Sequence, residues 1–360
     1  MATQEKKPEI LSAGAGLAAT VAAETHGELG ETEEIRARGY WEQVWIRFRR
    51  DKAAIGGGVF IVLLIAAAFG GAPLAKHLLG HGPNDQYIIA AIDQKTGQPV
   101  GPWTHIVADP SGLCPPSGGC PHALFILGAD SNLGRDEFLR LLYGAQVSLE
   151  VALGATLVSM CIGILLGSIA GYFGGWVDMI VSRLTEIVMA FPFLLFVVAL
   201  SSTVGQRLND ITFGGAIGPG VFTLVTVIGL FSWFYPARIV RAQVLSLREK
   251  EFVEAARMVG ASDFRIIRSH LLPHLVAPII VYSTLIVAQN ILFEAGLSFL
   301  GVGIPLPTAS WGNLLETAPQ YYTVQPWLML WPGLAVLLAT LAFNLLGDGL
   351  RDAFDPRSSH

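Results

Sequence analysis

Long apolar runs alternate with short polar connections along most of the chain. A helix needs about 20 apolar residues to cross the hydrocarbon core of a bilayer. Six runs reach that length, near 53–72, 147–172, 185–204, 221–240, 275–293 and 326–346. The pattern therefore predicts an all-α polytopic membrane protein with six transmembrane helices.

The composition agrees with a membrane protein. Only 14% of the residues are charged and the mean hydropathy is +0.53, whereas soluble domains carry roughly 25% charged residues. No basic tract with interleaved aromatic residues occurs, so membrane lipid is expected around the chain and nucleic acid is not an expected partner.

The placement of Lys and Arg predicts the orientation of the spans. Basic residues flank the first run and crowd the connection between the fourth and the fifth, whereas the connections 205–220 and 294–325 hold one, Arg207. Six spans with both termini in the cytoplasm satisfy this bias, and the tail 350–360 is then cytoplasmic. The basic residues are Arg47, Arg49, Arg50 and Lys52 in the first group, and Arg238, Arg241, Arg248, Lys250, Arg257, Arg265 and Arg268 in the second.

Two segments precede the first span. Residues 1–32 are rich in Ala, Gly, Thr and Glu, which predicts a disordered cytoplasmic tail. Their most apolar part, 11–23, is mostly Ala and Gly, so we do not expect a cleaved signal peptide. Residues 33–52 are expected to form an amphipathic helix at the membrane interface, with an apolar face of Trp41, Val44, Trp45 and Phe48.

The connection 73–146 is expected to be an extracytoplasmic loop or cap, long enough to be functional or ordered. Cys114 and Cys120 flank a turn-forming PPSGG spacer, and a disulfide between them is the favoured interpretation outside the cell. Free thiols remain an alternative, as does metal binding with His105 or His122. Cys161 is expected to be a small buried hydrophobic residue.

Polar and small residues inside the spans give two further predictions. Gly163, Gly167, Gly171 and Gly175 recur at every fourth position, which predicts close approach of a neighbouring helix, and Pro192 is expected to kink the third span. A polar solute path, or else hydrogen bonds to neighbouring helices, is predicted for Ser201, Ser202, Thr203, Gln289, Asn290 and Glu294. A structural ion pair or interfacial snorkelling is at least as well supported as substrate contact for Asp178, Arg183 and Glu186.

Signatures of catalysis are missing from the sequence. No GxxxxGK[ST] phosphate loop, HExxH, GxSxG or CxxC occurs. We therefore expect no enzyme, no bound cofactor and no metal in this chain. Transport, channel and assembly roles remain.

The segment Glu251–Pro278 is a charged, helix-favouring insert between two apolar runs. It predicts two short helices, Glu249–Val259 and Ser262–Leu271, with Gly260 at the turn and Ser262 or Asp263 as the cap of the second. Pro273 is expected to end the cytoplasmic helix and begin the fifth span. A polar helical insert at a membrane face suggests a docking surface for a soluble partner.

Three stretches resemble the inner-membrane permease subunits of binding-protein-dependent ABC importers. Glu254-Ala255-Ala256, Gly260 and Leu272-Pro273 resemble the EAA loop of that superfamily. Gly128–Leu149 is similar to the signature LGTDxxGRDxxSRLLYGARxSL of the second permease of dipeptide, oligopeptide and nickel systems, and 297–315 and 344–357 match the same branch. The signature is broken at Ala129, Leu139 and Gln146, and the branch usually lacks an insertion as long as 73–127.

The resemblance implies a type I ABC importer permease fold with a core at 147–349 and an EAA loop at 246–273 that receives motion from an ATPase. It implies a prokaryotic inner membrane, a homologous permease as heterodimer partner, two cytoplasmic ATPases that carry ATP and Mg, and an extracytoplasmic solute-binding protein. Peptides, nickel chelates and short glycans remain open as solutes. The implied ATPase-coupling residues are Glu254, Ala255, Ala256, Gly260, Ala261, Asp263, Leu272 and Pro273.

Two other classes of protein remain as alternatives. An ion-gradient-driven secondary transporter or channel would show two internal repeats with paired broken helices, which the sequence does not display. A non-transporting membrane scaffold for an ATPase complex is the other alternative. Uptake driven without any ATPase partner would favour the first of these.

Overall fold

The computed structural model describes residues 39–93, 95–107, 122–208 and 218–355. These residues are mostly helical, which confirms the all-α fold class. The elements up to residue 79 are α2 (Tyr40–Phe48), α3 (Lys52–Ile65), η1 (Ala66–Gly71) and α4 (Ala72–Leu79). From residue 137 onward the elements are α5 (Glu137–Phe173), α6 (Gly175–Ala190), α7 (Phe193–Leu208), α8 (Val221–Ser232), α9 (Phe234–Arg248), α10 (Glu251–Met258), α11 (Asp263–Arg265), η3 (Ile266–Leu271), α12 (Leu272–Phe299), α13 (Trp311–Thr317), η4 (Ala318–Gln320) and α14 (Trp327–Phe354).

Within the described ranges, four continuous helices are long and apolar enough to cross a membrane: Lys52–Leu79, Glu137–Phe173, Asp263–Phe299 and Trp327–Phe354. Two helix pairs pass the same test together but are bent, α6 with α7 by 83° and α8 with α9 by 41°. Counting each bent pair as one span gives the six that the sequence predicts. The sharper bend flanks Pro192, whose predecessor Phe191 has an extended backbone, as expected before proline.

Several helices are longer than their apolar runs. The second span begins at Glu137 rather than near 147, and the first continues to Leu79 rather than ending at 72. The last helix runs to Phe354, into the segment predicted as a tail. The helices extend beyond the apolar runs because hydropathy falls where charged residues begin, whereas the backbone hydrogen bonds of a helix continue through them.

Two π-helical turns lie shortly before prolines. The turn η1 precedes Pro73 and η3 precedes Pro273. Proline has no amide hydrogen and its ring clashes with the carbonyl four residues earlier. A π-helical turn changes that hydrogen-bond register without ending the helix. The prediction that Pro273 ends a separate cytoplasmic helix was therefore wrong: Asp263–Phe299 is one continuous helix.

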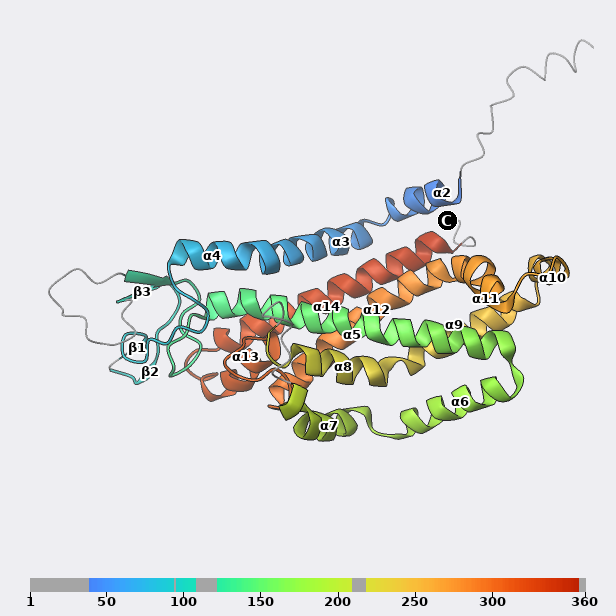
Figure 1. Ribbon diagram of the computed structural model, residues 1–360. Helices are drawn as coiled ribbons and strands as arrows, with labels where there is room; N and C mark the ends of the chain where they lie inside the picture. Colours follow the sequence, from blue (N-terminus) through green and yellow to red (C-terminus); the bar gives the residue numbers. More distant parts are fainter. Residues whose placement is uncertain (1–38, 94, 108–121, 209–217, 356–360) are drawn as a thin grey trace, which may run out of the picture. The chain divides into compact units, whose positions relative to one another are not determined.

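The helix α5 packs against α8, α9 and α12, while α14 packs against α12 and α3 (Figure 1). Gly163, Gly167 and Gly171 are the contact row with α9, where added Cβ atoms would lie 2.5–2.8 Å from its nearest atoms. Gly175 does not belong to this row: it has φ +53°, begins α6 and has nothing within 4 Å of an added Cβ. The packing prediction is thus met by three of the four glycines.

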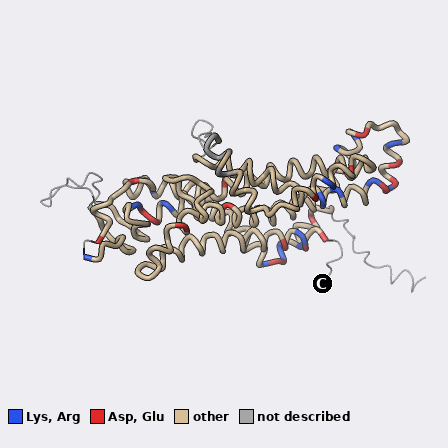
Figure 2. The backbone as a smooth tube through the Cα atoms, turned by 90° about the horizontal axis from the view of Figure 1, so that it is seen from below, with Lys and Arg blue, Asp and Glu red and all other residues tan. Residues whose placement is uncertain are grey.

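Charged residues gather toward the two ends of the long helices, with mostly uncharged stretches between them (Figure 2). One end carries the described residues 80–93, 95–107 and 122–136, here called the cap. It contains two antiparallel ribbons, β1 (Ile92–Asp93) with β2 (Gln98–Pro99) and β3 (Thr104–Val107) with β4 (His122–Phe125). A small core of Tyr87, Ala91, Ile106, Ala123, Phe125 and Ala129 lies beneath them.

The cysteine predictions have different outcomes. Cys114 and Cys120 lie outside the described residues, as does the predicted tail 1–32. Cys161 is exposed on α5, so the prediction that it is buried was wrong. Its neighbours Met160 and Ser159 face the bundle instead, because successive residues of a helix point in different directions.

Candidate functional site

The EAA loop folds as a helical hairpin whose turn requires glycine. After α10 ends at Met258, Gly260 takes the left-handed conformation with φ +80°. The amide of Gly260 donates to the Arg257 carbonyl (2.9 Å) and that of Ala261 to the Ala256 carbonyl (3.0 Å). These bonds satisfy carbonyls that the end of a helix would otherwise leave unpaired. The prediction of two helical segments joined at Gly260 is confirmed.

The end of α5 contacts both arms of this hairpin. The Tyr172 hydroxyl donates to Asp263 Oδ1 at 2.6 Å, and the Arg257 guanidinium lies 5.3 Å from the centre of the Tyr172 ring. Such a cation–π contact is modestly attractive. Ser262 is the N-cap residue of α11, yet no side-chain hydrogen bond caps that helix. The predicted capping role of Ser262 or Asp263 was wrong, because the Asp263 carboxylate is turned toward Tyr172.

One face of the hairpin is buried and the other is open. Val253 and Ile266 pack with Tyr172 and Val244 in one apolar cluster, against which Ala256, Ala261 and Leu272 also pack. The predicted coupling residues Glu254, Ala255, Gly260, Asp263 and Pro273 are exposed. Three large apolar side chains, here called the apolar tip, are exposed beside the turn: Met258 (82%), Val259 (88%) and Phe264 (71%).

The residues predicted to line a solute path lie in different environments, some buried between helices and some exposed. Glu294 is fully buried and accepts from Ser148 (2.6 Å) and Ser298 (2.8 Å), joining α12 to α5. Asn290 donates to Thr156 Oγ1 at 2.9 Å. The alternative of hydrogen bonds to a neighbouring helix therefore holds for both. Gln289 is exposed and, with Asn290, borders a cavity of about 60 Å³; the side chains of Ser201 and Ser202 lie outside the described part of the structure.

Ion pairs occur near the start of α6. Asp178 binds the Arg241 guanidinium of α9 with both carboxylate oxygens, which ties α6 to α9 just after the α5–α6 turn. Arg183 pairs with Glu186 at 2.7 Å on the exposed side of α6. The structural ion pair proposed from the sequence is thus found for all three residues, with Arg241 as an additional partner.

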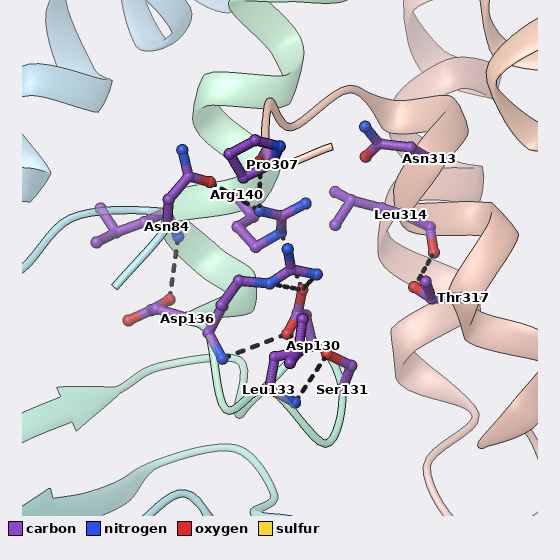
Figure 3. Close-up of polar contacts among 12 residues, drawn as sticks. Asn84, Asp130, Ser131, Leu133, Asp136, Arg140, Pro307, Asn313, Leu314 and Thr317 are labelled. Atoms are coloured by element: carbon purple, nitrogen blue, oxygen red, sulfur yellow. Dashed lines mark hydrogen bonds and ion pairs between the residues drawn. The ribbon is translucent and has the colours of Figure 1, made fainter. Parts of the chain in front are cut away.

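A cluster of buried charges lies where the cap meets α5, and sequence reasoning assigned it no role. Asp130 Oδ2 lies 2.7 Å from Arg135 Nη2 and 2.9 Å from Arg140 Nε, and each of the three side chains is at most 3% exposed. Arg140 Nη1 also donates to Asn84 (3.0 Å) and to the Pro307 carbonyl (3.2 Å) (Figure 3). The only sign of this cluster in the sequence was the high density of charged residues in 130–140, next to an apolar run.

His81 occupies a second buried position at this junction. Its Nδ1 lies 3.0 Å from the Leu79 carbonyl and its Nε2 lies 2.8 Å from Asp136 Oδ2, while its ring stacks on Phe125. Both neighbouring oxygens are acceptors, so both nitrogens donate only in the imidazolium form. Asp136 also accepts from the Leu139 amide at 3.0 Å as the N-cap of α5. His81 thereby links the end of the first span to the start of the second.

The pKa of His81 predicts a pH dependence of cap stability. Burial alone lowers this pKa, but the hydrogen bond to Asp136, the attraction of that carboxylate and the bond to Leu79 outweigh it, so the pKa is raised above 6.5. A raised folded-state pKa stabilises the cap below the unfolded value, and this contribution is lost as the pH rises through the folded-state pKa. Asp85 and Tyr87 are the other titratable groups nearby.

We expect protease resistance of the cap to fall on the alkaline side of pH 6.5, and His81→Gln to flatten that dependence. Gln donates to Asp136 without titrating. Limited proteolysis of the purified protein between about pH 6 and 9, a range that brackets an ordinary histidine pKa, measures the effect. His77→Gln is the control, because that residue is exposed on α4. An unchanged pH profile in His81→Gln would contradict the imidazolium assignment.

The helix pattern and the bent spans define a polytopic membrane protein with an exposed helical hairpin. Comparison with known proteins narrows this class. A family described as "Binding-protein-dependent transport system inner membrane component" matches residues 163–360, and "N-terminal TM domain of oligopeptide transport permease C" matches 39–95. The chain belongs to the family of binding-protein-dependent inner-membrane transport permeases, a family of transport rather than catalytic subunits.

Two relatives of similar sequence agree with this assignment. The glutathione transport system permease protein GsiD of Pectobacterium atrosepticum is 34% identical over 88% of this chain and 91% of its own length. A putative peptide permease protein of Brucella ovis is 44% identical over 64% of this chain and 72% of its own length. A chain of the MetNI methionine ABC transporter has a TM-score of 0.46 at 17% identity, covering 60% of this chain and 96% of that one.

Proposed function

We propose that this permease imports di- or oligopeptides, or similar small solutes, and that its EAA hairpin docks on a cytoplasmic ATPase. The single observation that carries the docking role is the open apolar tip of Met258, Val259 and Phe264, held on a base buried in the bundle. Exposed apolar side chains grouped on one feature mark an interaction site. Similarity to peptide and glutathione permeases supports the solute class.

The contacts at the base of the hairpin explain how its movement would reach the membrane. Val253 anchors α10 in the apolar cluster, and Tyr172 holds Arg257 and Asp263 against the end of α5. The second arm continues without a break into α12 through η3. A displacement of the tip would therefore move α5 and α12 together, as alternating access requires.

The remaining parts of the importer follow from this role. The basic residues around α9, α10 and η3 support a cytoplasmic location for that end of the bundle by the positive-inside rule, and we propose the same side for both termini. The cap then faces outward, where a solute-binding protein would deliver the solute. A homologous permease would complete the path, and two ATPase subunits would hold ATP and Mg.

Gly260→Pro and Glu254→Lys test the docking role. Proline cannot adopt φ +80° and lacks the amide that binds the Arg257 carbonyl, whereas lysine reverses an exposed charge of the motif. Because couplings between sites are commonly worth 5–150-fold, we expect at least about a 5-fold loss of ATP-driven uptake in proteoliposomes containing the complete transporter. Insertion into the membrane should be normal.

Glu249→Lys is the matched control, because it makes the same charge change at an exposed residue that is not among the predicted coupling residues. We expect near-normal uptake and normal co-purification of the ATPase subunits with this variant. Full ATP-dependent uptake by both test variants would contradict the docking role. Uptake by the purified chain without any ATPase would instead support an ion-gradient-driven transporter.

A further inference from the structure

Three adjoining cavities lie along the bent pairs α6–α7 and α8–α9, and the smallest of the three also borders α12. The first, of about 430 Å³, is bordered by Ser182, Thr185, Glu186, Arg238 and Arg241, and the second, of about 370 Å³, mainly by phenylalanines. These two share Met189. The second shares aromatic side chains with the small cavity beside Gln289 and Asn290. The three cavities form a row with polar groups at both ends and an aromatic middle.

Arg238 is the unusual group in this row. Arg241 pairs with Asp178 and Arg183 pairs with Glu186, whereas no acidic side chain within the described residues pairs with Arg238. Its Nη1 is 3.5 Å from the sulfur of Met189, and the guanidinium is exposed. Thioether sulfur is a weak acceptor, so the Arg238 guanidinium, unlike that of Arg241, has no anionic partner among the described residues.

Arg238 lies in the bent pair α8–α9, which by length and composition can form one membrane span. Arg238 precedes Arg248, the end of α9, by ten residues, or about 15 Å along the helix axis. Charged residues within membrane spans are rare, face the bundle interior or a water-filled space, and mark solute or ion paths. The aromatic middle of the row, with Phe191, Phe193 and Phe234, offers a surface for apolar side chains at the same level.

We propose that this row of cavities is the solute-contacting surface of the subunit and that Arg238 binds the carboxylate of the passing solute. A peptide with apolar side chains matches it in chemistry: its carboxylate meets a guanidinium that lacks an anion, and its side chains meet the phenylalanines. The amide groups farther along reach Gln289 and Asn290. A phospholipid would bind Arg238 and the phenylalanines but would make no hydrogen bonds with Gln289 and Asn290 at the other end of the row. The proposal rests on the proposed import function.

Photo-crosslinking tests the site without relying on transport. The probe is a dipeptide of alanine and p-benzoylphenylalanine, with either a free carboxylate or a carboxamide, applied to the complete transporter in nanodiscs without binding protein. We expect the carboxylate probe to label Met189 or its neighbours about 10-fold more than the amide, since charge-assisted hydrogen bonds are the strong ones. Arg238→Gln should reduce the carboxylate labelling to the level of the amide.

Arg238→Lys and Arg351→Gln complete the experiment. Lysine retains the charge and should preserve part of the preference, whereas Arg351 is exposed on α14, outside the row, and its replacement should change nothing. Equal labelling by the two probes, labelling elsewhere, or undiminished labelling of Arg238→Gln would overturn the proposal. So would native mass spectra in which a phospholipid is bound at Arg238 and excludes the probe. If the complete transporter showed no ATP-driven uptake while the carboxylate probe still labelled the row of cavities, the result would count against the import function alone.

Discussion

Replacing Asp130 with Ala is expected to destabilise the cap by about 3–5 kcal/mol, the usual result of removing one partner from a buried ion pair. Asp130 is the counter-charge for both Arg135 and Arg140, at 2.7 and 2.9 Å. Its removal leaves two buried guanidinium groups in a region of low dielectric constant. Arg140 also binds Asn84 and the Pro307 carbonyl, so the disturbance should reach the segment before α13.

Equilibrium unfolding of the purified protein in detergent, together with protease sensitivity within residues 80–136, would measure this loss. Asp130→Asn keeps the shape and removes only the charge, so a comparable loss would identify electrostatics as the cause. Asp93→Ala is the control: that carboxylate lies in an exposed turn and binds Lys95 and Thr96. A change below about 0.5 kcal/mol is typical of surface substitutions, and such a small change in Asp130→Ala would refute the prediction.

Gly167→Leu is expected to have the second large effect, because the backbones of α5 and α9 are in close contact at this glycine. A Cβ at Gly167 would lie 2.5 Å from the Ala237 carbonyl oxygen and 2.9 Å from Val240 Cβ. Overpacking of a tight interface costs about 1–3 kcal/mol and sometimes more. Leucine adds three carbons beyond that Cβ, so we expect the upper part of this range and a lower yield of folded protein.

The thermal midpoint of the purified variant, and its monodispersity in size-exclusion chromatography, measure the effect. Gly56→Leu is the matched control, since an added Cβ on that helical glycine has nothing within 4 Å. We expect its thermal midpoint to be unchanged or slightly higher, because glycine in a helix is unfavourable by about 0.5–1 kcal/mol. Equal midpoints for the two variants would show that the glycine row does not set the α5–α9 distance.

The EAA hairpin was the part of the site best predicted from sequence. Its turn depends on the backbone freedom of Gly260 and its helices on local composition, and both are properties of a short stretch. The details that failed were contacts with other elements. Asp263 binds Tyr172, which lies 91 residues earlier in the chain, so no local pattern around Ser262 could reveal that its neighbour had another partner.

The prediction of a solute path likewise depended on contacts between elements that are distant in the sequence. Glu294 looked like a pathway residue because a carboxylate in an apolar run needs an explanation. Ser148 and Ser298 supply that explanation as hydrogen-bond donors inside the bundle. Arg238, by contrast, was counted only as one of the basic residues that orient the chain. Its lack of an acidic partner within the described structure becomes visible only when the neighbours of α9 are placed.

The sequence by itself determined the class of fold, the spans and the position of the hairpin, because membrane crossing depends on the length and apolarity of each run. The tertiary structure decided the partners of the buried polar groups. His81 meets Asp136 across 55 residues and Ser148 meets Glu294 across 146. Such partners are chosen by helix packing rather than by neighbouring residues, since a buried charge binds whichever complementary group the fold brings within reach.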